Sequence, residues 1–177
     1  ALALLLDALD RGTGVEYATM TSIHAYTSDQ PLQDYAQGDQ RRSRSAAQNI
    51  IPNANASAAC VEQLLPRFAG RLSGCALNVP VQRGSLLDLN CVLRNVVDAE
   101  AVNELMRAAA AARPRLIAVA EDPIVSSDVI GCRQTLLFDA KGTQRAGSRM
   151  VKTLAWYETL GHACRVLDVV RTYAAIA

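Results

Sequence analysis

The chain has 177 residues, of which 50% are hydrophobic and 20% are charged, and its formal net charge is +1. This length predicts one domain, and the apolar content with mixed charges excludes an intrinsically disordered chain. The small net charge excludes a global field that attracts nucleic acid or an anionic membrane, so any anion site must be local. No apolar run of spanning length and no basic leader is present, which predicts a soluble cytoplasmic protein without membrane partners.

The cysteines do not form a recognisable framework. No Cys-x-x-Cys pair occurs, and only two histidines could share a metal with the five scattered cysteines, Cys60, Cys75, Cys91, Cys132 and Cys164. We therefore expect no metal site, and we expect buried, reduced thiols, above all at the two cysteines within apolar runs, Cys75 and Cys91. Cys164 lies beside Arg165 and two residues after His162, which is a weak indication of a reactive thiol.

The first half of the chain predicts a helix, a strand, a long loop and a second helix. Ala1 to Leu9 is rich in Ala and Leu and predicts a helix. Val15 to His24 alternates and is rich in Thr, Ile and Tyr, so it predicts a strand that carries His24 at its carboxyl end. The polar stretch from 26 to 48 is longer than ordinary connections, and such loops are commonly functional. Residues 56 to 68 have helical spacing, and Gly70 ends that helix.

The second half predicts more strands and two more helices. The runs 71–80 and 85–94 are strand-like, and the short turn between them predicts a hairpin. Asp98 is expected to cap a helix that ends at Pro114. Four further strands and a final amphipathic helix are predicted at 116–120, 135–138, 143–146, 149–157 and 160–176. Strands and helices without strict alternation predict an α+β domain with a mostly antiparallel or mixed sheet backed by helices.

Several segments match the motifs of one enzyme family in the same order. They are Met20–Gln30 (MTSIHAYTSDQ), Arg41–Arg44 followed by Asn49–Pro52, Asn78-Val79-Pro80 before Asp88-Leu89, Pro123–Asp128, Phe138–Ala140 and Val151–Tyr157. Together they resemble the catalytic, C-terminal domain of the phosphorylating glyceraldehyde-3-phosphate dehydrogenases over essentially the whole chain. The resemblance implies an NAD- or NADP-dependent oxidoreductase that oxidises glyceraldehyde 3-phosphate with inorganic phosphate through a cysteine thioester.

The resemblance also implies that parts of the enzyme lie outside residues 1–177. In the family the nucleophilic cysteine lies a few residues before the position of Ala1, behind an amino-terminal Rossmann domain that binds the dinucleotide. None of the five cysteines aligns with that nucleophile. We therefore expect this chain to be the catalytic domain of a longer protein, and we expect it to be inactive by itself.

His24 matches the catalytic base of the family. A thiolate that attacks an aldehyde needs a partner that holds its proton and later moves protons on the hemithioacetal oxygen, and an imidazole suits both tasks. The alternative is a histidine in the core at the end of a strand, and the flanking motif favours the catalytic role.

The resemblance assigns two phosphate sites to six positions of this chain, namely Thr27, Asp29, Arg42, Asn55, Ala56 and Asn78. Hydroxyl donors, an arginine fork and backbone amides are suited to phosphate. Two positions depart from the family pattern, because Asn55-Ala56 stands where the family has Thr-Gly and Asn78 stands where it has arginine. The loss of that arginine removes one charge-assisted hydrogen bond.

The nicotinamide position also departs from the family, since Thr159 is the nearest replacement for an asparagine that binds the carboxamide. Two alternatives therefore stay open. One is a related dehydrogenase for another aldehyde, such as erythrose 4-phosphate, and the other is a non-catalytic, oligomeric family member.

The basic run Arg41–Arg44 indicates either a solvated loop or a nucleic-acid patch. With two nearby tyrosines and a net charge of +1, we expect no nucleic-acid partner. In the family this loop lines the cofactor site and packs across a tetramer, so we expect a homo-oligomer. The last helix packs on the Rossmann domain in the family, so Val166, Val169 and Val170 are expected to be exposed in this chain alone.

Overall fold

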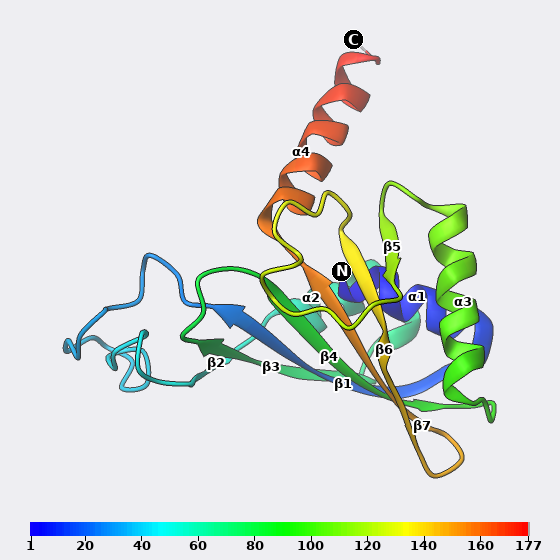
Figure 1. Cartoon of the computed structure of the whole chain (residues 1–177), viewed down its shortest axis with the longest axis horizontal. Helices are drawn as coiled ribbons and strands as arrows, with labels where there is room; N and C mark the ends of the chain where they lie inside the picture. The colour runs from blue at the N-terminus through cyan, green and yellow to red at the C-terminus, as the bar shows by residue number, and fades with distance from the viewer. Residues whose placement is uncertain (177) are drawn as a thin grey trace.

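The computed structural model describes residues 1–176, which form four α-helices, one 3-10 helix and a single sheet of seven strands (Figure 1). In chain order the elements are α1 (Leu2–Thr13), β1 (Val15–Ala25), β2 (Ile51–Ala54), α2 (Ser57–Leu64), η1 (Pro66–Phe68), β3 (Leu72–Val79), β4 (Ser85–Leu93), α3 (Ala99–Ala112), β5 (Ile117–Ala120), β6 (Leu136–Ala146), β7 (Met150–Tyr157) and α4 (Thr159–Ala174). The α+β class predicted from the sequence is confirmed.

The sheet is mixed, with the strand order β2-β3-β1-β4-β7-β6-β5. β1 pairs parallel with β3 and antiparallel with β4. The expected hairpin of β3 and β4 is therefore wrong, because β1 lies between the two strands. The connection from Val79 to Ser85 needs to cross only two interstrand spacings, about 10 Å, which a linker of this length reaches easily. The alternation of the two runs predicts strands but does not encode their partners.

Other boundaries differ from the predictions for local reasons. The two short strands expected at 135–138 and 143–146 are one strand, β6, whose register with β7 shifts between Asp139 and Gln144. α1 continues to Thr13 and ends at Gly14, which has a φ of 69° that favours glycine. The helix expected up to residue 68 ends at Leu64, and η1 follows it. The predicted cap is confirmed, since the side chain of Asp98 accepts a hydrogen bond from the Ala101 amide at 2.8 Å.

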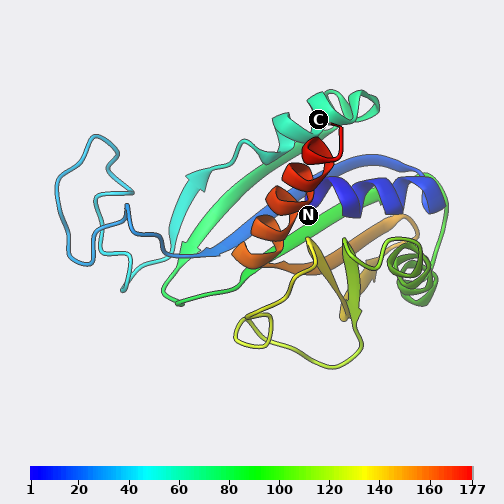
Figure 2. The ribbon, with the colours of Figure 1, turned by 90° about the horizontal axis from the view of Figure 1, so that it is seen from above.

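Helices cover one face of the sheet, as the view from above shows (Figure 2). Along β1 the side chains of Ala18, Met20 and Ser22 are buried beneath α1, whereas Tyr17 on the opposite face is 56% exposed. α1 supplies the centre of the core with three leucines that have no exposed surface, Leu5, Leu6 and Leu9. Because α1 packs on this face of the sheet, a site that includes the first residues of α1 must lie on the same face.

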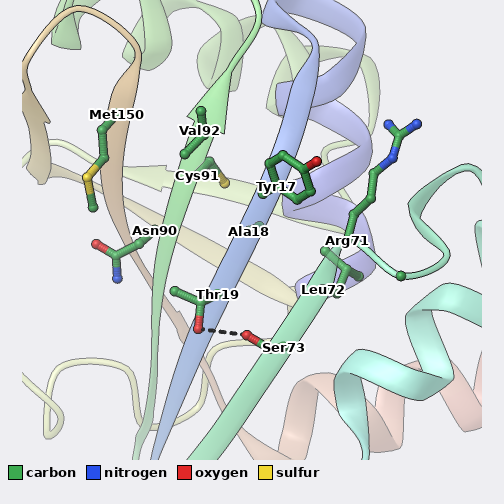
Figure 3. Close-up of a pocket in the computed structure, with 11 residues that line it drawn as sticks. Tyr17, Ala18, Thr19, Arg71, Leu72, Ser73, Asn90, Cys91, Val92 and Met150 are labelled. Atoms are coloured by element: carbon green, nitrogen blue, oxygen red, sulfur yellow. Dashed lines mark hydrogen bonds between the residues drawn. The ribbon is translucent and has the colours of Figure 1, made fainter.

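The opposite, open face of the sheet carries a shallow hollow of about 340 Å³ (Figure 3). Tyr17, Thr19, Asn90 and Met150 lie around it, and Ser73 donates a hydrogen bond to Thr19 at 3.2 Å. This lining offers amide and hydroxyl groups but no histidine. It is therefore not suited to proton transfer near neutral pH.

The expectation of buried cysteines is only partly right. Cys91 is buried, and burial raises the pKa of its thiol to about 12. Cys75 and Cys60 are exposed, although Cys75 lies in an apolar run. Cys75 pairs with Thr21 of β1 and faces the open side of the sheet, which an apolar run cannot reveal when only one face of the sheet is covered.

α4 extends away from the sheet (Figure 1). Its valines at 166, 169 and 170 are between 50% and 57% exposed, as expected for a helix without its partner surface in this chain. Within residues 1–176, no helix is both long and apolar enough to cross a membrane.

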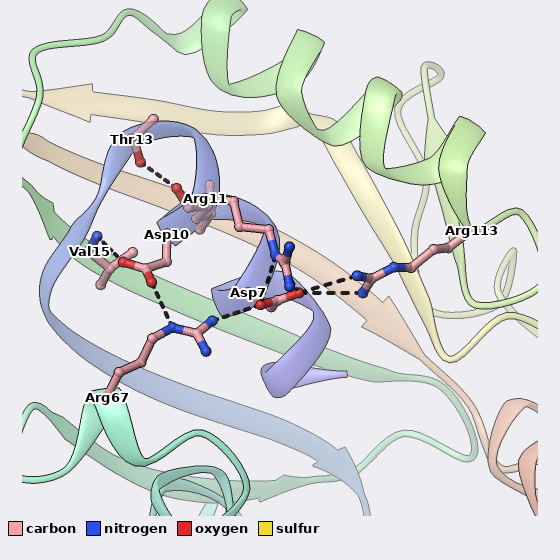
Figure 4. A network of polar contacts seen from close by, with 8 residues as sticks. Asp7, Asp10, Arg11, Thr13, Val15, Arg67 and Arg113 are labelled. Atoms are coloured by element: carbon pink, nitrogen blue, oxygen red, sulfur yellow. Dashed lines mark hydrogen bonds and ion pairs between the residues drawn. The ribbon is translucent and has the colours of Figure 1, made fainter.

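One carboxylate connects three parts of the helical layer (Figure 4). Asp7 of α1 is 8% exposed and accepts hydrogen bonds from Arg11 at 3.1 Å, from Arg67 of η1 at 2.7 Å and from Arg113 after α3 at 3.4 Å. Arg67 also donates to Asp10 at 2.8 Å. Burial by itself would raise the pKa of Asp7, but the hydrogen bonds from Arg11 and Arg67 outweigh it and lower the pKa.

We expect Asp7→Asn to lower the free energy of unfolding at pH 7 by about 1.5 to 3 kcal/mol, because hydrogen bonds to a charged group are lost. The folded pKa of Asp7 lies below its ordinary value near 3.9. Its contribution is therefore complete above about pH 4 and is lost as the pH falls through the folded pKa. Urea unfolding at pH 7 and pH 3 measures both effects, with the exposed Asp122→Asn as the control. An equal loss of unfolding free energy in Asp7→Asn and Asp122→Asn would contradict the stabilising role of Asp7 and its arginine partners.

Candidate active site

Four neighbouring strands bring polar side chains into one lateral row. His24 near the end of β1 is in register with Asn78 of β3 on one side and with Ser85 of β4 on the other. Ser85 is in turn in register with Tyr157 of β7. Residues in register on adjacent strands lie within about 5.5 Å of each other. The sheet therefore brings these polar groups together at one end of its inner strands, although they are far apart in sequence.

His24 is surrounded by hydroxyl groups. Its Nε2 lies 2.8 Å from Ser22 Oγ, and its Nδ1 lies 3.1 Å from Ser85 Oγ. The Tyr157 hydroxyl lies 3.0 Å and 3.2 Å from Nε2 and Nδ1, and 2.5 Å from Ser22 Oγ. The two rings meet edge to face, with their centroids 5.6 Å apart. The imidazole is thus held in a fixed orientation by neutral partners.

This environment shifts two pKa values in opposite directions. Burial lowers the pKa of His24, because the charged imidazolium loses hydration. Burial also raises the pKa of Tyr157, and the hydrogen bond to Ser22 only partly opposes that shift. Near neutral pH the site therefore combines a neutral imidazole with a neutral phenol, which is the state that a proton acceptor requires.

A cavity of about 410 Å³ opens beside His24. Residues from five segments of the chain line it, namely Ala1, His24, Ser85, Thr135, Tyr157, Glu158, Thr159, His162 and Arg165. Ala1 directly precedes α1, so the start of the central helix reaches the same cavity as the histidine. Two buried polar atoms at this cavity, Thr135 Oγ1 and Arg165 Nε, have no hydrogen-bond partner among the described residues.

The predicted anion residues of the long loop bind one another. Thr27 Oγ1 donates to one carboxylate oxygen of Asp29, and the Arg42 guanidinium donates to the other. The hydrogen bond from Thr27 is the main cause that lowers the pKa of Asp29, and the Arg42 charge adds to it. All three side chains lie together in the structure. Arg42 and Asp29 form an ion pair without net charge. An anion that binds here would therefore compete with Asp29 for Arg42.

Asn78 is buried, and its amide is already satisfied. Its Nδ2 donates to the carbonyl of Ala25 at 3.2 Å, and its Oδ1 accepts a hydrogen bond from Asn53 Nδ2. At the other predicted pair, Asn55 Oδ1 accepts from the amide of Ser57 at 2.7 Å and Ala56 precedes α2. Neither Asn55 nor Ala56 lines the cavity beside His24.

Sequence reasoning missed several residues of this site. Ser22 could have been found, because it lies two residues before His24 on the same face of a predicted strand. Ser85 and Tyr157 depend on the pairing of β1, β4 and β7, which local patterns do not contain. Thr159, the predicted nicotinamide residue, lies in the cavity together with His24.

Residues 1–176 contain no group of three His, Cys, Asp or Glu side chains that could hold a metal ion. None of the five cysteines lines the cavity beside His24 in the described structure.

Comparison with known proteins agrees with the motifs. The family described as glyceraldehyde 3-phosphate dehydrogenase, C-terminal domain, matches residues 1–159. The glyceraldehyde-3-phosphate dehydrogenases of Kitasatospora aureofaciens and Clostridium acetobutylicum are each 40% identical over 99% of this chain, which covers 53% and 54% of those proteins. Glyceraldehyde-3-phosphate dehydrogenase 2 of Bacillus subtilis is 39% identical over 98% of the chain and 52% of that protein.

The mixed sheet with helices on one face, and with His24 near the carboxyl end of its inner strand β1, is an α+β domain that matches a dehydrogenase family. The chain belongs to the family of glyceraldehyde-3-phosphate dehydrogenase C-terminal domains, as its motifs predicted. It spans about half the length of the curated relatives it matches.

We expect the ring of His24 to titrate with a midpoint below about 6.5 in the folded protein. The folded pKa is lower than the unfolded one, so the neutral ring favours folding. That contribution is complete above about pH 6.5 and is lost as the pH falls. NMR titration of the ring signals measures the midpoint, with His162→Gln for assignment and the urea-unfolded chain as reference. A folded midpoint above the unfolded one would contradict the desolvated site.

Proposed function

We propose that the chain is the catalytic domain of an NAD- or NADP-dependent phosphorylating aldehyde dehydrogenase that acts on glyceraldehyde 3-phosphate. Family membership supports an oxidoreductase. The observation that carries the proposal is the shared cavity of His24 and Ala1. A nucleophilic cysteine placed a few residues ahead of α1, as the family resemblance implies, would enter the cavity that His24 faces.

In this proposal His24 moves the protons of the reaction. Its neutral imidazole takes the proton of the thiol, the thiolate sulfur bonds to the aldehyde carbon, and the imidazolium returns the proton to the carbonyl oxygen, which gives the hemithioacetal and a neutral imidazole again. His24 then takes the proton from the hemithioacetal oxygen while hydride leaves the same carbon, which gives a thioester. When bound, the dinucleotide supplies the hydride acceptor. Inorganic phosphate attacks the thioester carbon, and the cysteine leaves as the thiolate.

The cavity fits the nicotinamide end of such a cofactor but not the whole molecule. A carboxamide needs both donors and acceptors, and the hydroxyl of Thr159 in the cavity lining offers both. The remainder of the dinucleotide would bind to a part of the protein outside residues 1–177. The choice between NAD and NADP stays open.

The residues at the predicted phosphate positions depart from the family pattern, and this departure supports two alternatives. Asn78 provides no charge, and its amide groups bind Asn53 and Ala25 instead. Arg42 would bind phosphate only in competition with Asp29. A related dehydrogenase for another aldehyde, such as erythrose 4-phosphate, is therefore one alternative, and a non-catalytic, oligomeric member is the other. The predicted tetramer and the cytoplasmic location stay predictions.

In the complete enzyme we expect His24→Ala to slow acylation by a factor of about a hundred to ten thousand, because general-base catalysis is lost. Stopped-flow detection of the reduced cofactor measures the burst. The control is Asn90→Ala on the open face of the sheet. A burst rate equal to that of the unchanged enzyme, with an intact circular dichroism spectrum, would return His24 to the role of a core residue.

Asn78→Arg tests the substrate. If a phosphate binds beside Asn78, the new charge should lower KM for glyceraldehyde 3-phosphate by about tenfold or more, since a charge-assisted hydrogen bond is worth about 1.5 to 3 kcal/mol. Unphosphorylated glyceraldehyde is the control and should show no change. If no phosphate binds there, the arginine replaces a satisfied buried amide with an unpaired charge, and the melting temperature falls without a gain in KM. That second result would contradict the assignment of glyceraldehyde 3-phosphate.

A further inference from the structure

The two ring nitrogens of His24 are held by serines from different strands. Ser22 of β1 is 3% exposed and lies at Nε2, whereas Ser85 of β4 lies at Nδ1. A neutral imidazole has one N–H donor and one acceptor nitrogen, so one serine must donate to it and the other must accept from it. Each tautomer of His24 therefore requires one particular direction of these hydrogen bonds.

Tyr157 decides the direction. Its hydroxyl lies nearly equally far from both ring nitrogens, at 3.0 Å and 3.2 Å, so it does not itself select one. Its closest contact is Ser22 Oγ at 2.5 Å. A phenol, with an ordinary pKa near 10, is a far stronger acid than an aliphatic hydroxyl and is the better donor. Tyr157 therefore donates to Ser22, and the Ser22 proton is directed to Nε2.

The remaining nitrogen then carries the proton. With Nε2 as the acceptor, Nδ1–H donates to Ser85 Oγ across the β1–β4 pair. The chain of donors runs from Tyr157 to Ser22, from Ser22 to Nε2, and from Nδ1–H to Ser85. Each bond in such a chain polarises the next and strengthens it.

We propose that Ser22, directed by Tyr157, and Ser85 are positioning residues that fix His24 in the Nδ1–H tautomer and make Nε2 its basic nitrogen. This role rests on the proposed function in so far as it serves proton transfer, but the tautomer itself is a property of the folded chain. When Nε2 takes a proton, it becomes a donor to Ser22 Oγ, and the hydrogen bond between Ser22 and Tyr157 reverses, so that Ser22 donates to the Tyr157 hydroxyl. Ser85 accepts from Nδ1–H throughout, so the ring keeps its orientation through the proton transfer.

The test is the ¹⁵N NMR spectrum of the imidazole at pH 8, where the ring is neutral, because the two nitrogens give distinct shifts when protonated or bare. We expect the Nδ1–H form in the unchanged protein. Ser22→Ala should reduce the ratio of Nδ1–H to Nε2–H by about two- to tenfold, which corresponds to one hydrogen bond. Ser22→Thr retains the hydroxyl and should restore the ratio. Ser73→Ala on the open face is the control and should leave the ratio unchanged.

Tyr157→Phe tests the direction of the hydrogen bonds around His24 without changing the packing of the ring, since it removes only the phenol oxygen. We expect it to reduce the Nδ1–H population in the same sense as Ser22→Ala, with the His24 signals still those of a folded protein. A dominant Nε2–H form in the unchanged protein would overturn the proposal, as would a tautomer ratio that neither Ser22→Ala nor Tyr157→Phe alters.

These results are independent of turnover. If His24→Ala leaves the burst unchanged while the Nδ1–H form is observed, the proposed function fails and the tautomer assignment holds. If His24→Ala abolishes the burst while the Nε2–H form is observed, the assignment of His24 as the base holds and the positioning role of the serines fails.

Discussion

The placement of β1 between β3 and β4 is the constraint on which the site depends. Its register sets His24 beside Asn78 on one strand and Ser85 on the other, and β4 extends the row to Tyr157 of β7. Because side chains alternate along a strand, a shift of one residue would turn His24 to the open face. The buried alternation of Ala18, Met20 and Ser22 beneath α1 prevents that shift. The alternation of buried residues along β1 thus fixes both the packing of the hydrophobic core and the position of His24.

α1 couples the stability of the domain to the geometry of the site. Its leucines fill the core, its Asp7 binds arginines from η1 and from the end of α3, and its beginning reaches the cavity of His24. The two polar clusters differ in kind. Asp7 is surrounded by cations, so it stays ionised and anchors the helices, whereas His24 is surrounded by neutral hydroxyls and stays uncharged near neutral pH.

Local patterns predicted the elements and the fold class, but not the partners of the strands. The alternation of β1, the cap at Asp98 and the helical spacing of α1 depend on neighbours in sequence, and each is confirmed. The hairpin of β3 and β4 failed because strand pairing is a long-range property. The same limit hid the contribution of Ser85 and Tyr157 to the site. The family motif supplied His24, Thr27 and Arg42, while the engagement of Arg42 by Asp29 required the folded loop.

The central claim is that His24 faces the start of α1 and can take the proton of a thiol there. The most direct measurement is the pH dependence of iodoacetamide alkylation at a cysteine introduced by Ala1→Cys, followed by mass spectrometry of that peptide. A helix N-terminus favours the thiolate, and His24 adds to this effect when it takes the thiol proton and stands beside the sulfur as imidazolium. The account predicts a midpoint below the ordinary thiol value of about 8.5, and a higher midpoint when His24→Ala is added. Identical midpoints with and without His24 would contradict it.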